Sequence, residues 1–123
     1  MSQNFDKTKY TEEELSEFEH IIDEKLVNAK RQLQFYLMQL GDMADNQDAK
    51  VKGLDDGNGT AEVERLTGLA ARQKKHIQHL ENAKIRIQNK VYGICRVTGK
   101  LISKQRLRAV PHATLSIEAK QKG

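Results

Sequence analysis

The sequence predicts a mainly α-helical protein, built as an antiparallel two-helix coiled-coil hairpin followed by a small C-terminal knuckle. Two long stretches carry apolar residues at every third or fourth position, which is the pattern of amphipathic helices. A segment rich in glycine and aspartate separates them. Charged residues make up 31% of the 123 residues, aromatic residues make up 5%, and proline occurs once. This composition favours long exposed helices over a compact sheet, and the length fits one small domain.

The first helix is predicted to begin at Thr11, after a flexible and unpatterned tail at residues 1–10. The Thr11 hydroxyl can accept the amide of Glu14, whose carboxylate reaches back, and this arrangement is a capping box. The helix should end near Gly41. Its apolar stripe consists of Leu15, Phe18, Ile22, Leu26, Ala29, Leu33, Leu37 and Leu40. A further aromatic and apolar group at residues 35–38 widens the stripe, and we interpret this group as additional core.

The segment 41–60 is predicted to be the loop at the tip of the hairpin. It holds four glycines, five aspartates and two asparagines without a sustained period. Within it, Asp55, Asp56 and Gly57 invite comparison with a calcium-binding loop, but the alternating ligands and the terminal glutamate of an EF-hand are missing. We therefore predict no calcium site in this loop.

The second helix is predicted to begin after a cap at Thr60 and to run to about Lys90, before Gly93 ends it. Its seam has the spacing of a heptad repeat and consists of Val63, Leu66, Ala70, Gln73, Ile77, Leu80, Lys84 and Ile87. Two helices of this length can bury their stripes only against each other. The hairpin therefore covers residues 11–90 and should be about 45 Å long, from 1.5 Å of rise per residue.

Charge is distributed unevenly along the chain, although the net charge is only +4. Residues 1–64 carry seven Lys/Arg against fifteen Asp/Glu, whereas residues 84–123 carry ten Lys/Arg against one Glu. We interpret this as an acidic end and a basic end. The basic end is either a solvated face or a contact surface for nucleic acid or an acidic protein. Sequence-specific DNA binding is not expected. The sequence has no recognition-helix motif, and no run of aromatic residues alternates with the lysines and arginines of the basic end.

Several classes of protein are excluded by what the sequence lacks. A single cysteine cannot form an internal disulfide framework, and there is no signal peptide or apolar run of membrane length. The four histidines are scattered, and neither a phosphate-binding glycine loop nor a nucleophile with a nearby base is present. We therefore expect a cytoplasmic protein that is neither an enzyme nor a membrane protein.

The C-terminal segment 91–123 carries two pairs of positions three residues apart, like the ligand positions of a zinc knuckle. Cys95 and Thr98 form the first pair, and Ser116 and Ala119 form the second. Three further residues lie in register with this pattern: Ile102, Arg106 and Pro111. The segment resembles the DksA/TraR family, whose C4 zinc finger has four cysteines at these spacings. The resemblance implies a degenerate zinc-finger-like head with a C-terminal helix.

A structural zinc site needs four thiolate or imidazole ligands, and this head supplies one thiol at those positions. Hydroxyls at Thr98 and Ser116 and a methyl at Ala119 are not zinc ligands, and adding His112 to Cys95 would leave two positions open. We therefore expect no cofactor and a head held together by packing. In this interpretation Cys95 is a small buried apolar residue, and the two hydroxyls bond to the backbone or to each other.

The resemblance also implies a function. Proteins of this family insert their coiled coil into the secondary channel of RNA polymerase, place acidic tip residues near the catalytic magnesium and modulate initiation. Their tip pattern, D-x-x-D-x-A, falls on Lys52, Asp55 and Gly57, with Asp56 adjacent. One acid is kept, so the expected polymerase contacts are Asp55, Asp56 and Gly57. RNA polymerase is the expected partner, and we expect a monomer.

The family also uses basic groups to bind the alarmone ppGpp, and these fall on His79, Val110 and Lys120. Only Lys120 is basic at neutral pH, and valine cannot replace the phosphate grip of an arginine. We therefore expect weak ppGpp binding or none. The alternative function is a non-catalytic helical-hairpin adaptor or scaffold that acts through protein–protein contacts and dimerises through the exposed remainder of its stripe.

Overall fold

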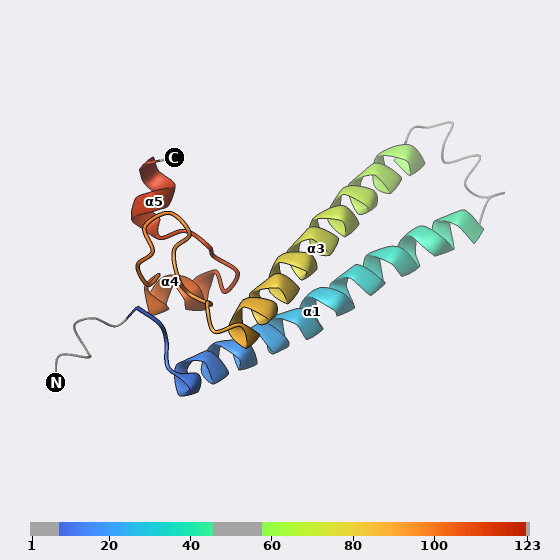
Figure 1. Cartoon of the computed structure of the whole chain (residues 1–123). Coiled ribbons are helices and arrows are strands. Elements are labelled where there is room, and N and C mark those ends of the chain that lie inside the picture. Colours follow the sequence, from blue (N-terminus) through green and yellow to red (C-terminus); the bar gives the residue numbers. More distant parts are fainter. Residues whose placement is uncertain (1–7, 46–57, 123) are drawn as a thin grey trace. The chain divides into compact units, whose positions relative to one another are not determined.

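The structure is a computed structural model that describes residues 8–45 and 58–122, and within these ranges it is mainly helical. The prediction of a mainly α fold is confirmed. Two long helices are followed by two short ones (Figure 1). In chain order they are α1 (Glu12–Asp45), α3 (Asn58–Gln88), α4 (Lys104–Ala109) and α5 (Ile117–Lys122). Within the described residues, β-structure is limited to one isolated antiparallel bridge between Ile94 and Leu101.

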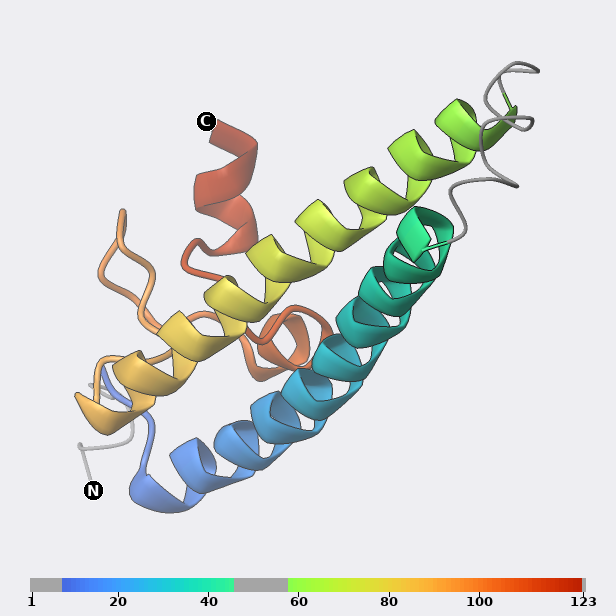
Figure 2. The same cartoon turned by 90° about the vertical axis from the view of Figure 1, so that its right-hand side faces the viewer.

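The two long helices divide between two compact units. Unit 1 comprises Met1–Leu26 and His79–Gly123, and unit 2 comprises Val27–Gln78. In each unit a section of α1 lies beside a section of α3 and runs in the opposite direction (Figures 1 and 2). The long apolar stripes have the predicted partners, because each helix buries its stripe against the other.

The first helix begins with the predicted capping box. The Thr11 amide donates to Glu14 Oε1 at 2.8 Å, and the Glu14 amide donates to Thr11 Oγ1 at 3.2 Å. Three acidic residues in the first turn lie next to the positive end of the helix dipole. Helix initiation at this point is therefore determined locally.

The helices extend further toward the tip than the sequence predicted. The first helix passes through Gly41 and ends at Asp45, and α3 begins at Asn58, so that Thr60 is its third residue rather than its cap. A glycine inside a helix costs only about 1 kcal/mol relative to alanine. Beyond Gly41, Met43 and Leu66 of α3 line the same surface hollow, so α3 lies beside the last turn of α1. The predicted tip residues Asp55, Asp56 and Gly57 lie outside the described residues.

The apolar group at residues 35–38 is not the additional core that the sequence indicated. Phe35 is 58% exposed and Met38 is 62% exposed, and Leu37, a member of the predicted stripe, is also exposed. A single neighbouring helix covers only one stripe, and in this unit the buried positions include Ala29, Leu66, Ala70 and Ile77. The widened stripe therefore leaves part of its apolar surface in solvent.

An aromatic cluster forms the centre of unit 1. Phe18 lies between two tyrosines, with ring centroids 5.6 Å from Tyr10 and 5.5 Å from Tyr92. The Tyr10 hydroxyl donates to the carbonyl of Ile102, and the Tyr92 hydroxyl donates to the carbonyl of Pro111 at 2.7 Å. The predicted flexible tail at residues 1–10 therefore ends before Tyr10, because this side chain is buried against the head.

The connection from α3 into the head is a Schellman-type helix end. The Val91 amide donates to the carbonyl of Arg86 and the Lys90 amide to that of Ile87, both at 3.0 Å, while Lys90 has a φ of 62°. Gly93 follows with a φ of 78°, and a Cβ at this position would lie 2.7 Å from the Tyr10 ring. Glycine is required here for both its backbone conformation and its size.

Acidic residues at the start of α1 lie beside basic residues of α3 and the head. The ion pairs join Lys84 to Asp23, Lys90 to Glu12, Lys104 to Glu14 and Arg108 to Glu17. All of them lie within unit 1. The sequence predicted that acidic and basic residues lie at opposite ends of the molecule. For these acidic residues the prediction is wrong, because the later part of the chain folds back beside the start of α1 and its lysines and arginines pair with them.

Candidate functional site

The first half of the knuckle is a tight turn that carries Cys95 and Thr98. The Cys95 amide donates to the carbonyl of Lys100, and the Gly99 amide donates to the carbonyl of Cys95, both at 2.8 Å. Gly99 has a φ of 72°, which glycine adopts without strain. This turn places the amide of Thr98 toward the sulfur of Cys95, at 3.5 Å.

The second half of the knuckle brings the other predicted pair to the same sulfur. The Arg96 amide donates to the carbonyl of Thr114 at 2.9 Å and so holds the two halves together. The Ser116 amide then donates to Cys95 Sγ at 3.3 Å, and Ser116 Oγ accepts the Ala119 amide at 3.1 Å at the start of α5. Ala119 is buried. The structure therefore brings Thr98 and Ser116 to the Cys95 thiol, and Ser116 in turn holds Ala119 through its hydroxyl.

Cys95 has a more polar role than that of the buried apolar residue expected from the sequence. Its side chain is 1% exposed, as expected for a core position. Hydrogen bonding to the Thr98 side chain, and then to the amides of Ser116, Thr98 and Val97, lowers the pKa of the thiol to about 6. Hydrogen bonds to the charged form favour the thiolate. The sulfur is therefore a hydrogen-bond acceptor at the centre of the knuckle.

The donors in this cluster do not fit a zinc ion. One thiol, two hydroxyls and a methyl occupy the four positions, and zinc sites require thiolate, imidazole or carboxylate ligands. The Thr98 hydroxyl accepts the Lys100 amide at 3.2 Å, and the Ser116 hydroxyl caps α5. Within the described parts of the chain, no three His, Cys, Asp or Glu residues are grouped so that they could hold a metal.

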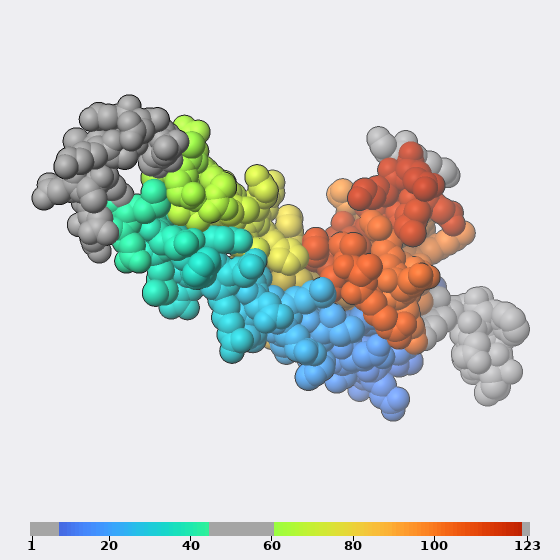
Figure 3. Space-filling view, turned by 180° about the vertical axis from the view of Figure 1, so that it is seen from behind, coloured from blue at the N-terminus to red at the C-terminus, as the bar shows by residue number. Residues whose placement is uncertain are grey.

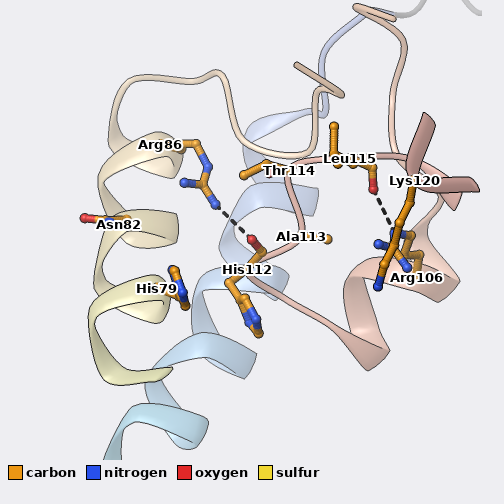
Figure 4. A pocket seen from close by; sticks show the side chains of 9 residues that line it. All are labelled: His79, Asn82, Arg86, Arg106, His112, Ala113, Thr114, Leu115 and Lys120. Atoms are coloured by element: carbon orange, nitrogen blue, oxygen red, sulfur yellow. Dashed lines mark hydrogen bonds between the residues drawn. The ribbon is translucent and has the colours of Figure 1, made fainter. Parts of the chain in front are cut away.

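A basic pocket of about 280 Å³ lies in unit 1 (Figure 4). Helix α3 contributes three of its side chains, α4 and α5 contribute one each, and the segment between those two helices supplies the rest. Its lining consists of His79, Asn82, Arg86, Arg106, His112, Ala113, Thr114, Leu115 and Lys120. The pocket therefore collects cationic and titratable groups from elements far apart in the sequence.

The two arginines of the pocket hold the segment at residues 112–115. Arg86 Nη2 donates to the carbonyl of His112 at 3.4 Å, and Arg106 Nε donates to the carbonyl of Leu115 at 2.8 Å (Figure 4). Burial lowers the pKa of Arg86, and the nearby Tyr92 opposes this shift. The rings of His79 and His112 stack with centroids 5.6 Å apart and an interplanar angle of 9°.

The structure brings together two of the three predicted alarmone positions. His79 and Lys120 line the same pocket, whereas Val110 is not among its lining residues. The sequence reading missed Arg86, although it lies seven residues after His79 and therefore on the same side of α3. It also gave no role to His112 in this pocket. The knuckle residues Ile102 and Pro111 are buried, as their place in the family pattern suggests.

Comparison with known proteins matches this region to one family. The family model for the prokaryotic dksA/traR C4-type zinc finger matches residues 90–122. The chain also superimposes on the structure of transcription factor DksA2 from Pseudomonas aeruginosa with a TM-score of 0.80, at 25% identity, over 89% of this chain and 81% of that one. The head at residues 90–122 belongs to the DksA/TraR zinc-finger family. The fold of the chain is that of the coiled-coil transcription factor DksA2.

Two curated proteins match parts of the chain. The RNA polymerase-binding transcription factor DksA of Caulobacter vibrioides is 37% identical over 65 residues, which cover 51% of this chain and 46% of that protein. General stress protein 16O of Bacillus subtilis is 24% identical over 100 residues, covering 80% of this chain and 59% of that protein. The chain thus matches about half the length of these curated relatives. In the residues described here, no helix is both long and apolar enough to cross a bilayer.

Proposed function

We propose that this protein is a non-enzymatic transcription regulator that binds RNA polymerase through its secondary channel and modulates initiation with the tip of its hairpin. The observation that carries the proposal is the agreement of the whole hairpin and head with the transcription factor DksA2, at a TM-score of 0.80. A relative that matches half of the chain is named an RNA polymerase-binding factor. In unit 2 the chain consists of sections of α1 and α3 alone, and a pair of helices is narrow enough for a channel to admit.

The expected contacts at the end of the hairpin are Asp55, Asp56 and Gly57. Carboxylates close to the catalytic magnesium of polymerase would change the local electrostatics without reading DNA sequence. The protein would act as a cytoplasmic monomer, since a second copy on the hairpin would obstruct its insertion.

The head, in this proposal, folds without zinc. The Cys95 sulfur accepts amide hydrogen bonds from Thr98 and Ser116, and these bonds join the two halves of the knuckle where a metal joins them in a C4 finger. The buried side chains of Ile102, Leu107 and Ala119 complete the packing. The head would therefore position the hairpin in the absence of a metal.

Binding of ppGpp in the basic pocket is expected to be weak or absent. Lys120 and His79 are present, but Val110 supplies no charge, and the two arginines already donate to backbone carbonyls. Phosphate recognition relies on bidentate hydrogen bonds from arginine. To make them, these two side chains would have to release the backbone carbonyls to which they donate.

The proposal is tested by measuring binding of the purified chain to core RNA polymerase, with and without a protein that blocks the secondary channel. We expect binding that the blocker abolishes, together with an altered lifetime of open complexes. An Asp55→Asn, Asp56→Asn double variant should bind with similar affinity and lose the effect on initiation. Absence of binding, or binding that the blocker leaves unchanged, would rule out insertion into the channel.

The alternative, a helical-hairpin adaptor, is favoured by the exposed apolar residues of unit 2. It requires a stable dimer or another protein partner in place of polymerase. Sedimentation equilibrium of the full chain at micromolar concentration separates the two: a tight dimer supports the adaptor, and a monomer that binds polymerase supports the regulator.

A further inference from the structure

The segment at residues 82–117 contains eight lysines and arginines and no acidic residue. Six of the eight side chains have partners within unit 1: four form ion pairs with acidic residues of α1, and two donate to backbone carbonyls of residues 112–115. These six are Lys84, Lys90, Lys104, Arg108, Arg86 and Arg106. Arg96 and Lys100 remain, and neither side chain forms an ion pair or a hydrogen bond with a residue that the structure describes. The described fold therefore makes no use of these two cations.

Arg96 and Lys100 lie on opposite arms of one turn of the head, residues 96–100, which we call the knuckle turn. All five of its residues are exposed. The antiparallel bridge between Ile94 and Leu101 closes the base of the turn. In Figure 2 the end of the turn, drawn in orange, stands clear of the helices of unit 1, and Figure 3 shows the head from another side. The two cations are therefore presented on a narrow two-stranded projection.

The backbone of the knuckle turn is fixed at several points. The Gly99 amide donates to the carbonyl of Cys95 at 2.8 Å, and the Arg96 amide donates to the carbonyl of Thr114 at 2.9 Å. Gly99 has a φ of 72°, which lets the chain reverse without strain. A partner would therefore meet a turn that is already ordered, and this lowers the entropic cost of binding.

The charged residues beside the knuckle turn do not cancel its positive charge. The hydrogen bonds from Arg96 to Thr114 and from Ser116 to Cys95 bring the start of α5 next to the turn. Helix α5 contributes one acidic residue in its first turn, Glu118, and the exposed Lys120 two residues later. These two charges offset each other. The local field at the knuckle turn is therefore positive, and it favours an anionic partner.

The shape and the residue types of the knuckle turn fit a duplex nucleic acid better than an acidic protein. Val97, which is 69% exposed, is the one large apolar residue of the turn, whereas the centre of a protein interface is built from several apolar and aromatic side chains. The major groove of B-DNA is about 12 Å wide and admits a two-stranded ribbon. The Thr98 hydroxyl is already bonded to the Lys100 amide and to the Cys95 sulfur. The turn therefore offers contacts to phosphates and little that could read base edges.

We propose that the knuckle turn binds the phosphate backbone of duplex DNA without sequence preference, with Arg96 and Lys100 each contacting a phosphate. This inference goes beyond the function proposed above and does not depend on it, because the contact requires no polymerase. Two phosphate contacts contribute about 1.8 to the steepness with which the logarithm of the binding constant falls with the logarithm of the salt concentration. A rise from about 50 to about 200 mM salt should therefore weaken their contribution about twelvefold.

The test measures binding of the 123-residue chain to a fluorescent DNA duplex of mixed sequence by anisotropy, at low and high salt. An Arg96→Gln, Lys100→Gln double variant keeps the backbone bonds of the turn, so its fold should be retained. We expect its affinity at about 50 mM salt to fall at least about tenfold, and its salt dependence to be less steep by about 1.8. The matched control is a Lys104→Gln, Arg108→Gln double variant, which removes the same charge from side chains that are paired with Glu14 and Glu17. This control should stay within about threefold of the wild type, because surface ion pairs contribute little to folding and the removed charges are already neutralised.

The outcomes decide the proposal without reference to polymerase. Loss of binding in the turn variant alone supports it, together with equal displacement of the labelled duplex by unlabelled duplexes of different sequence. A wild type that does not bind the duplex overturns it, and so do equal losses in the two double variants, which would show that only net charge matters. Displacement of the duplex by polyglutamate as readily as by unlabelled DNA would assign the turn to an acidic protein surface instead. The proposed function stands or falls separately, because its own test measures binding to polymerase.

Discussion

Unit 1 and unit 2 are built from the same two helices, yet they are stabilised very differently. Unit 1 adds the aromatic cluster around Phe18, four ion pairs to the first turns of α1 and the hydrogen-bonded knuckle. Unit 2 has a narrow seam between two helices and leaves Phe35 and Met38 exposed. The difference indicates that folding stability is concentrated in unit 1, whereas unit 2 leaves apolar surface exposed.

The sharpest test of this difference compares two phenylalanines of α1. Phe18→Ala should lower the free energy of unfolding by about 3 to 5 kcal/mol, because the side chain is fully buried between two tyrosines. Phe35→Ala should change it by less than about 0.5 kcal/mol, as exposed substitutions usually do. Urea denaturation of both variants measures the effects. Equal losses would mean that unit 2 is packed as tightly as unit 1.

Two glycines provide a second comparison. Gly93→Ala should destabilise by about 3 kcal/mol, because it combines strain at a φ of 78° with a clash against the Tyr10 ring. Gly68→Ala in α3 meets nothing within 4 Å, so it should be neutral or should stabilise by up to about 1 kcal/mol. Thermal unfolding followed by circular dichroism measures both. A mild effect of Gly93→Ala would show that Tyr10 is not fixed against the head.

The pH dependence of unit 1 should report on Cys95. Its pKa is lowered from 9.0 to about 6 in the folded chain, so the unfolded chain binds the proton more tightly. The stabilising contribution is therefore complete above about pH 9, declines as the pH falls toward 6 and is lost below it. Melting temperatures measured from pH 5.5 to 9 should rise more steeply for the wild type than for Cys95→Ser. Parallel profiles would show that no thiolate is stabilised in the knuckle.

The smallest expected effect belongs to the ion pair between Lys84 and Asp23. Lys84 Nζ lies 2.7 Å from Asp23 Oδ1, and this hydrogen bond raises the pKa of Lys84. Both side chains are partly exposed, so Lys84→Gln should cost no more than about 1 kcal/mol, and less at high salt. Urea denaturation of the wild type and Lys84→Gln at low and high salt measures this loss in the free energy of unfolding. A larger loss that salt does not reduce would indicate that Lys84 acts through its aliphatic packing instead.

The helices and the capping box were predictable because local patterns determine them. The period of the apolar residues and the pair Thr11 and Glu14 are properties of short segments. The errors concern residues whose environment depends on distant parts of the chain. Tyr10 is buried because the head folds back onto it, and Gly41 is helical because α3 lies beside the turn that follows it. A sequence period also cannot tell which members of a wide stripe face the neighbouring helix, and this is why Phe35 and Met38 were misplaced.

The candidate site also has features that the sequence predicted and features that it did not. The spacing of Cys95, Thr98, Ser116 and Ala119 predicted which residues meet in the knuckle. It did not reveal that backbone amides converge on the sulfur, because that depends on the folded turn and on the pairing of Arg96 with Thr114. Arg86 was overlooked in the basic pocket because a single arginine on a helix carries no motif of its own.

Metal content and chelator sensitivity of the purified 123-residue chain test the account most directly. We expect no stoichiometric zinc by elemental analysis, and melting curves that are the same with excess chelator, with added zinc and with neither. One zinc per chain, together with loss of the folded head on chelation, would contradict a knuckle held together by hydrogen bonds to Cys95 and by packing.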